Sequence, residues 1–250
     1  MIESSPAKPK IKNQKSEIQN RFINYRPRLR RRVLGFALRV AMKLLLKLEV
    51  VGWENVPPGG GVILMINHIA FLDPVLLTGL FPRPIISMAK AEALDEKIVG
   101  PLIKAFDAFP VNRGTSDRLA LRTALDVLAA GLPLLIAPEG HRSEAVMLGE
   151  AHEGIAFVAS RSHAPIVPVG ISGTDQFKHN FKRFRRTHVI YRFGQPFYLD
   201  AGDERANSDV LKRMTDEAMY QLAAILPSQQ RGLYANLESA TTQYIRFVGQ

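Results

Sequence analysis

A chain of 250 residues, 46% of them hydrophobic, is long enough to bury the core of one α/β domain with appendages. It has no cysteine, which excludes disulfides, a thiol nucleophile and cysteine-ligated zinc, and which fits a reducing compartment. The formal net charge at pH 7 is +10, and residues 1–50, with 13 Lys/Arg and 3 Asp/Glu, account for all of that excess. The basic N-terminal arm is therefore predicted to contact a polyanion, either nucleic acid or anionic lipid.

The arm divides into two parts. Residues 1–20 are rich in Lys, Ser, Pro, Asn and Gln, have no apolar signal segment, and are predicted to be a disordered tail of a cytoplasmic protein. Residues 21–48 are predicted to form a basic amphipathic, membrane-associating helix. Its cations cover an arc of roughly 80° on a helical wheel, namely Arg32, Arg39, Lys43 and Lys47, and opposite them stand Val33, Ala37, Val40, Ala41, Leu44, Leu45 and Leu48. Cations at 39 and 43 keep the apolar run below the ~20 residues that a transmembrane helix needs. The alternative is a helix that packs its apolar face on the domain.

Predicted strands and helices alternate through residues 49–226, which we expect to form one domain. Strands are predicted at 49–54, 62–66, 85–89, 108–111, 133–137, 165–170 and 188–193, and helices at 74–81, 95–106, 116–130, 152–162 and 208–226. This order predicts an α/β fold with a mixed or mostly parallel central sheet flanked by helices. Residues 227–250 are expected to be a C-terminal tail.

A histidine and an aspartate follow the predicted strand 62–66, in the run Asn67-His68-Ile69-Ala70-Phe71-Leu72-Asp73-Pro74. Open α/β folds place their chemistry at the carboxyl ends of strands. A carboxylate on one imidazole nitrogen would fix the tautomer and support the cation formed when the other nitrogen takes a proton. Asp73 followed by Pro74 also has the pattern of a helix N-cap, so spacing alone leaves two possibilities: a catalytic pair, or a cap and a turn residue.

Polar residues also follow the other predicted strands. They are Lys90, Asn112, Arg113, Glu139, His141, Arg142 and Ser143. One possible base among several cations suits a substrate that carries both a hydroxyl and a phosphate, because Arg binds phosphate in a bidentate fork and Lys adds a point charge. Taken singly, each cation fits a solvated or salt-bridged surface position better than a binding role, but their shared placement after strands shifts that balance.

Other chemistries have weaker support. The histidines lack metal-ligand spacing, so no metal is predicted, and neither a phosphate-binding Gly-rich loop nor a dinucleotide motif is present. The run Gly170-Ile171-Ser172-Gly173-Thr174 resembles a nucleophile elbow but has Thr where the last Gly belongs. A lipid-directed serine hydrolase using Ser172 therefore stays as an alternative.

Four sequence blocks together carry a family resemblance. Asn67-His68-x4-Asp73, Asn112-Arg113, Pro138-Glu139-Gly140-His141-Arg142-Ser143 and Val167-Pro168-Val169 resemble, in this order, the blocks of the glycerolipid acyltransferases. The match is similar to the bacterial 1-acylglycerol-3-phosphate acyltransferases and covers about residues 50 to 200.

The resemblance implies acyl transfer from acyl-CoA or acyl carrier protein, as thioester co-substrate and without a cofactor, to the free hydroxyl of a lysophospholipid. The expected acceptor is 1-acylglycerol-3-phosphate, giving phosphatidic acid. His68 would be the general base and Asp73 would orient it. By the same resemblance Lys90 and Arg113 would hold the acceptor phosphate, and the acceptor-binding block would be Glu139, Gly140 and Arg142.

The chain departs from the family at two positions. His141 stands where members usually have Thr, and Asn112 where they usually have Asp, so another lyso-lipid or glycolipid hydroxyl stays open as the acceptor. Because such substrates reside in bilayers, the arm is expected to bind an anionic membrane surface at its cytoplasmic face rather than nucleic acid. A second basic cluster could bind the same surface or form a solvated hairpin loop; it comprises Lys178, Lys182, Arg183, Arg185 and Arg186, with Phe177, Phe181 and Phe184 interleaved. A non-catalytic binding module is the remaining alternative.

Overall fold

The computed structural model describes residues 22, 25–27, 29–97, 99–112 and 117–249. The predicted tail 1–20 and the predicted phosphate ligand Arg113 lie outside the described residues. The strands are β1 (Leu46–Val51), β2 (Val62–Ile66), β3 (Ile86–Lys90), β4 (Phe109–Val111), β5 (Pro133–Ile136), β6 (Ile166–Ser172), β7 (Thr187–Phe193), β8 (Phe197–Leu199) and β9 (Ile245–Phe247). The α-helices are α2 (Leu29–Leu45), α3 (Asp73–Leu80), α4 (Val99–Ala105), α5 (Arg118–Ala129), α6 (Gly154–Ser162), α7 (Phe177–Lys182) and α8 (Ser208–Ala224).

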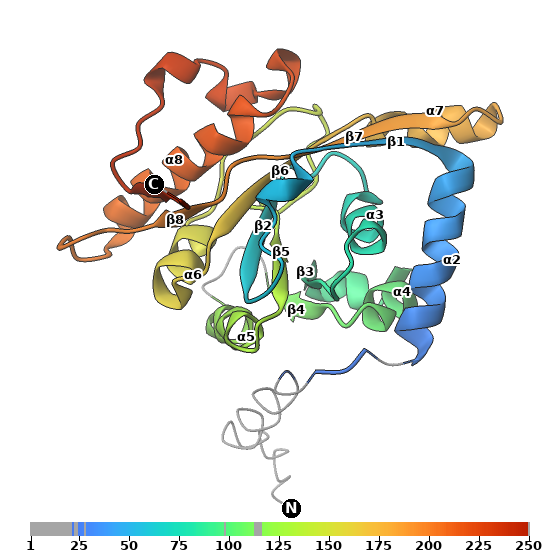
Figure 1. The fold of residues 1–250 in the computed structure, drawn as a ribbon, viewed down its shortest axis with the longest axis horizontal. Coiled ribbons are helices and arrows are strands. Elements are labelled where there is room, and N and C mark those ends of the chain that lie inside the picture. Colours follow the sequence, from blue (N-terminus) through green and yellow to red (C-terminus); the bar gives the residue numbers. More distant parts are fainter. Residues whose placement is uncertain (1–21, 23–24, 28, 98, 113–116, 250) are drawn as a thin grey trace, which may run out of the picture.

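The described strands form one mixed sheet in the order β1-β7-β6-β2-β5-β3-β4, with β8 paired to β6 and β9 paired to β8 (Figure 1). From β6 to β4 the neighbouring strands are parallel, so the carboxyl ends of five strands meet at one edge of the sheet. The strands β7 and β8 run antiparallel to β6. The predicted α/β fold with a mixed central sheet flanked by helices is confirmed.

Strand β2 lies at the centre of the molecule, and all five of its side chains are fully buried. Ile63 and Met65 belong to the core under α5, α6 and α8, whereas Val62, Leu64 and Ile66 belong to the core under α2 and α3. A strand covered on both faces needs apolar residues at every position, which explains its continuous apolar sequence. Figure 1 shows these two helical layers on opposite sides of the sheet.

The predicted amphipathic segment 21–48 continues beyond the end of its helix. Helix α2 ends at Leu45 and passes directly into β1, which pairs in parallel with β7 at the edge of the sheet. The helix contacts α3 at Gly79, where an added Cβ would lie 2.7 Å from a Leu38 methyl carbon, so only glycine permits this approach.

The expectation that residues 227–250 form a tail outside the domain is wrong. Strand β9 pairs antiparallel with β8, and Tyr244 and Ile245 are buried. The buried Glu217 of α8 holds this segment, since its carboxylate accepts the backbone N–H groups of Gln243 and Tyr244 at 2.8 Å each. A strand of three residues is too short to give a detectable periodic pattern, so the sequence carried no signal for it.

Candidate active site

The segment after β2 is fixed to the neighbouring strand β6 by one side chain. The Asn67 side-chain amide donates to the Ile171 carbonyl oxygen at 2.9 Å, and its oxygen accepts the Ile171 N–H at 2.7 Å. Asn67 is buried, so these two bonds satisfy an amide that would otherwise cost free energy in the interior. They determine where the chain leaves the sheet and hence where His68 lies.

His68 and Asp73 contact each other. Asp73 Oδ2 lies 3.1 Å from His68 Nδ1 and accepts the backbone N–H groups of Ile69 at 2.8 Å and Ala70 at 2.7 Å. Its other oxygen, Oδ1, accepts the hydroxyl of Thr174 at 2.6 Å. The turn between β2 and α3 therefore brings together two residues that a continuous helix would hold about 140° apart.

The predicted role of Asp73 as N-cap is wrong. Its carboxylate binds N–H groups that precede it in the chain, and the N-cap position is occupied by Leu72, which makes no side-chain cap bond. Pro74 stands at the start of the helix, as predicted. The carboxylate is thus used to close the turn and to contact the imidazole.

This geometry gives the two imidazole nitrogens different roles. Asp73 is fully buried, whereas the His68 side chain is 17% exposed. Because Nδ1 faces a carboxylate, it is the nitrogen that carries a proton in the neutral ring, and Nε2 is the nitrogen that can take another. The pair can therefore remove a proton from a substrate hydroxyl, with the carboxylate stabilising the resulting imidazolium.

The segment after β5 is bonded directly to this turn. The Ser143 N–H donates to the His68 carbonyl oxygen at 2.7 Å. The Glu139 side chain is buried, accepts the Gly149 N–H at 2.8 Å through Oε2, and has no partner for Oε1 among the described residues. Burial raises the pKa of Glu139, and the N–H groups of Gly149 and His68 oppose that rise.

Gly140 is required by both conformation and space. Its φ is +70°, and an added Cβ would lie 2.8 Å from His152 Cδ2. The next residue, His141, is exposed and has Nδ1 2.7 Å from the Glu139 carbonyl oxygen, so Nδ1 is its donor nitrogen.

The structure does not bring all the predicted site residues together. Lys90 is exposed at the end of β3 and pairs with Glu92 at 3.6 Å, and Arg142 is exposed after β5. Asn112, after β4, donates both its backbone N–H and its side-chain amide to Asp117 Oδ2 at 2.9 Å each. Partial burial of Asp117 acts to raise its pKa, but hydrogen bonds from Ala120, Asn112 and Leu119 outweigh it and lower the pKa.

Sequence reasoning missed Thr174, which lies 101 residues from Asp73 in the chain. One feature of the sequence could have identified Thr174: it follows the predicted strand that becomes β6. Because β6 is a parallel neighbour of β2, the residues after both strands lie at the same edge of the sheet. A pocket of about 430 Å³ borders this turn and is lined by Ala145, Val146, Met147, Ser172, Gly173, Asp175, Pro227, Gln229 and Gln230.

Ser172 lies in that pocket without a base. Its hydroxyl donates to Gln230 Oε1 at 2.7 Å rather than to an imidazole. An amide oxygen cannot act as a general base at neutral pH, so this arrangement does not support the serine hydrolase alternative. Within the described part of the chain, no group of three or more acidic or histidine side chains could hold a metal ion.

Comparisons with known proteins identify the family to which this α/β chain belongs. A family model described as Acyltransferase matches residues 47–172. The 1-acyl-sn-glycerol-3-phosphate acyltransferase of Bacillus subtilis is 31% identical over 182 residues, which are 72% of this chain and 88% of that protein. The chain therefore belongs to the acyltransferase family.

Two further similarities extend this result. The 1-acyl-sn-glycerol-3-phosphate acyltransferase of Borreliella burgdorferi is 31% identical over 134 residues, 53% of this chain and 54% of that protein, so the match spans about half of that relative. The crystal structure of the 1-acyl-sn-glycerophosphate (LPA) acyltransferase PlsC from Thermotoga maritima has a TM-score of 0.55 and 23% identity, covering 82% of this chain and 85% of that one. That likeness supports the fold.

The raised pKa of Glu139 predicts a pH-dependent stability. A carboxyl group whose pKa is raised by folding stabilises the protein below its unfolded pKa, roughly 4.3, and this contribution is lost as pH rises through the folded pKa. We expect the unfolding free energy of the wild type, relative to that of Glu139→Gln, to fall as the pH rises above the unfolded pKa. Urea denaturation at a series of pH values measures it. The control is Glu238→Gln, at an exposed position. The prediction would be contradicted if the unfolding free energy of the wild type, relative to that of Glu139→Gln, stayed constant or increased with pH.

Proposed function

We propose that the protein transfers an acyl chain from acyl-CoA or acyl carrier protein to the free hydroxyl of a lysophospholipid, with 1-acylglycerol-3-phosphate as acceptor and phosphatidic acid as product. The observation that carries this proposal is the imidazole of His68 held by the fully buried Asp73 at the carboxyl end of β2. The names of the similar proteins support the acceptor. The four-block resemblance supports the donor class.

His68 is the proposed general base. Its Nε2 takes the proton of the acceptor hydroxyl while that oxygen attacks the thioester carbonyl, and Asp73 stabilises the imidazolium through Nδ1. The tetrahedral intermediate then expels the thiolate as the carbon–sulfur bond breaks. The imidazolium returns its proton to the leaving thiolate, so an ester replaces a thioester and no acyl-enzyme is formed.

The proposed acceptor contacts are the residues that the family resemblance implies. Lys90 and Arg142, which are exposed at the end of β3 and after β5, would supply cations for the acceptor phosphate, together with Arg113, which lies outside the described residues. Glu139 and Gly140 belong to the segment that is bonded to the His68 turn. The side-chain amide of Asn112 donates to Asp117. A carboxylate at position 112 would lie close to that of Asp117 and would be repelled by it.

Replacing the proposed base tests the function. His68→Ala should lower turnover by about 10²–10⁴-fold, and Asp73→Asn should lower it as well, because the amide cannot support the imidazolium. Release of free thiol from acyl-CoA, with 1-acylglycerol-3-phosphate in mixed micelles, measures the rate. The matched control is His188→Ala, which removes an exposed histidine paired with Glu49 on the sheet surface. Undiminished turnover in a folded His68→Ala protein would exclude His68 as the base.

Helix α2 is the proposed contact with the cytoplasmic face of the membrane. Its buried positions are Arg31, Gly35 and Met42, while an apolar stripe on the other side is between 42% and 76% exposed. The stripe consists of Leu29, Val33, Phe36, Val40 and Leu44. Exposed cations flank it, namely Arg32, Arg39 and Lys43. This exposure favours an interfacial helix. Leu45, another residue of the predicted apolar face, packs against the core, so that face is shared between the domain and the exposed stripe.

No helix of the described residues combines the length and apolar character needed to cross a bilayer. Contact through an exposed stripe with flanking cations is the mode of binding that this helix offers. It would place the catalytic domain at the surface where a lysophospholipid resides.

The stripe can be tested without altering charge. Substituting Val33, Phe36 and Val40 together by Ser should weaken binding to anionic vesicles by at least 10²-fold, because each loses about 1.5 kcal/mol or more of apolar transfer free energy. Vesicle co-sedimentation measures this. A matched triple Ser variant at exposed apolar positions elsewhere, Leu119, Leu233 and Val248, should bind like the wild type. Wild-type binding by the α2 variant would refute the anchor.

A further inference from the structure

The segment between β6 and β7 is short, aromatic and basic. Residues 177–186, named here the α7 hairpin, place Phe177 against the core under α2 and α3, and its ring stacks on Phe181 with centroids 5.7 Å apart. Phe181 is 56% exposed and Phe184 is 100% exposed. A fully exposed Phe ring contributes nothing to folding, so an aromatic pair at this tip points to a partner outside the chain.

The exposed cations of the hairpin are not neutralised within the described protein. Lys178, Lys182, Arg183 and Arg185 are exposed, and none of them pairs with a carboxylate of another described residue. Residues 51–250 are neutral overall, so this is a local concentration of positive charge. Cations that surround exposed aromatic rings are complementary to an anionic surface with an apolar interior.

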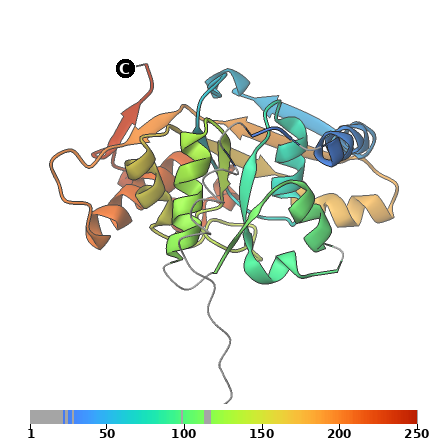
Figure 2. The same cartoon turned by 90° about the horizontal axis from the view of Figure 1, so that it is seen from below.

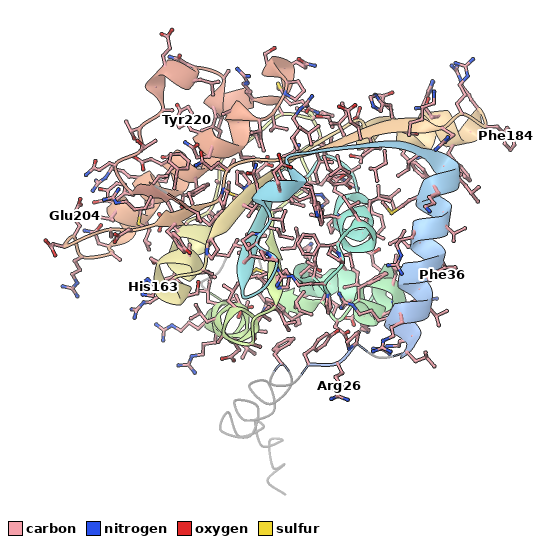
Figure 3. The ribbon with its side chains drawn as sticks, in the orientation of Figure 1. Arg26, Phe36, His163, Phe184, Glu204 and Tyr220 are labelled. Atoms are coloured by element: carbon pink, nitrogen blue, oxygen red, sulfur yellow. The ribbon has the colours of Figure 1, made fainter. Side chains whose placement is uncertain are left out.

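The hairpin is joined to α2 at the base. Arg186 Nε donates to the Leu46 carbonyl oxygen at 3.0 Å and Nη2 donates to that of Lys43 at 2.9 Å, so this side chain caps the carboxyl end of α2. In Figures 1 and 2 the two helices lie at the same end of the molecule. Figure 3 shows Phe36 of α2 and Phe184 of the hairpin at that end.

We propose that the α7 hairpin is a second lipid-binding element, in which Phe181 and Phe184 insert into the interface of an anionic bilayer while the cations bind lipid phosphates. This inference rests on the proposed contact of α2 with the membrane. A single helix lying in the interface leaves the domain free to roll about the helix axis. A second contact joined to its end by Arg186 removes that freedom and sets the orientation of the catalytic edge.

A bilayer fits this surface better than RNA does. Aromatic rings between cations could stack on bases, but apart from Phe36 the neighbouring α2 stripe offers aliphatic side chains, which neither stack on bases nor pair with them. A partner that covers both elements must be apolar beneath an anionic layer. A phospholipid bilayer has this layered chemistry.

Two hairpin variants separate the aromatic from the charged contribution. The first is Phe181→Ser with Phe184→Asn, where Asn is chosen because residue 184 has φ +52°. The second replaces Lys182, Arg183 and Arg185 by Gln. Its matched control replaces Arg118, Arg122 and Arg205, which are exposed cations on α5 and on the loop before α8, so the net charge changes equally.

Binding to phosphatidylglycerol vesicles is measured by co-sedimentation. We expect about fivefold weaker binding per removed hairpin cation at low salt, a clear loss for the aromatic variant at all salt concentrations, and wild-type binding for the control. Equal binding by wild type, hairpin variants and control would overturn the proposal. So would hairpin-dependent binding to RNA in a gel-shift assay without hairpin-dependent binding to vesicles.

Turnover assays with two forms of the acceptor distinguish this inference from the proposed function. With a short-chain monomeric acceptor the hairpin variants should turn over like the wild type, whereas with acceptor presented in vesicles they should be slower. If the wild type transfers no acyl chain at all, the proposed function fails, and vesicle binding alone still decides the role of the hairpin. Equal loss with both acceptors would mean a structural defect and would overturn the inference.

A separate observation concerns Asp73. Among the described residues, Oδ1 of this fully buried carboxylate accepts a hydrogen bond from the Thr174 hydroxyl alone, at 2.6 Å, and Thr174 is itself buried. The other oxygen contacts His68 and two backbone amides. The hydroxyl therefore governs both the rotation of the carboxylate about its Cβ–Cγ bond and its proton affinity.

We also infer that Thr174 is a positioning residue for the proposed base, acting through Asp73. Among the described residues, the other titratable groups that face the pair are Glu139, beside His68, and Tyr191, beside Asp73, and substitution of Thr174 leaves both in place. Without the Thr174 hydroxyl the carboxylate becomes a stronger acceptor for the imidazole proton. Thr174→Val should lower kcat by about tenfold and move the acid limb of the kcat/KM profile to higher pH. Thr174→Ser should restore both.

The matched control for lost stability is Thr215→Val, which removes a buried hydroxyl that donates to the Leu211 carbonyl oxygen on the distant helix α8. It should leave the acid limb in place. An unmoved acid limb in Thr174→Val, or failure of Thr174→Ser to restore it, would overturn the positioning role.

Discussion

The candidate site depends on one buried negative charge. A carboxylate removed from water is stable only when its oxygens are well hydrogen-bonded, because the cost of desolvating an ion is several kcal/mol. Asp73 meets this condition with two amides of its own turn, one imidazole and the hydroxyl of Thr174. Three of these four donors are local, and the fourth comes from the end of β6. The charge is therefore accommodated only when β6 lies beside β2.

Hydrogen bonds between neighbouring strand ends also hold the other polar segments of the site. Asn67 ties the start of the His68 turn to β6, and the Ser143 N–H ties the carbonyl of His68 to the segment after β5. Strand β2 lies between β5 and β6, so these hydrogen bonds hold the His68 turn from both neighbouring strands. Blocks that are far apart in the sequence thus form one hydrogen-bonded unit on parallel strand ends. An imidazole held this way needs little reorganisation if it takes a proton.

Patterns within one segment were readable from the sequence, and contacts between segments were not. The buried strands, the order of elements and the strand-end positions of His68 and Glu139 follow from apolar runs and turn residues. Whether Asp73 capped a helix or contacted the imidazole depended on the fold of a six-residue turn, and its partner Thr174 is 101 residues away. Likewise, an amphipathic wheel locates the apolar face of α2 but not the side on which the domain packs.

The proposed lipid-binding hairpin and the pair His68–Asp73 are linked by one short stretch of chain. The turn Thr174–Gln176 passes without a break into α7. Only two residues therefore separate Thr174, whose hydroxyl binds Asp73, from Phe177, the first aromatic residue of the hairpin. The buried Phe177 fixes the start of that helix to the core. Because Phe177 stands between them, movement at the exposed tip need not disturb Asp73, whereas displacement of Phe177 would move Thr174 as well. A change at Phe184 should therefore affect the proposed membrane contact alone, whereas a change at Phe177 should affect both that contact and the proposed base.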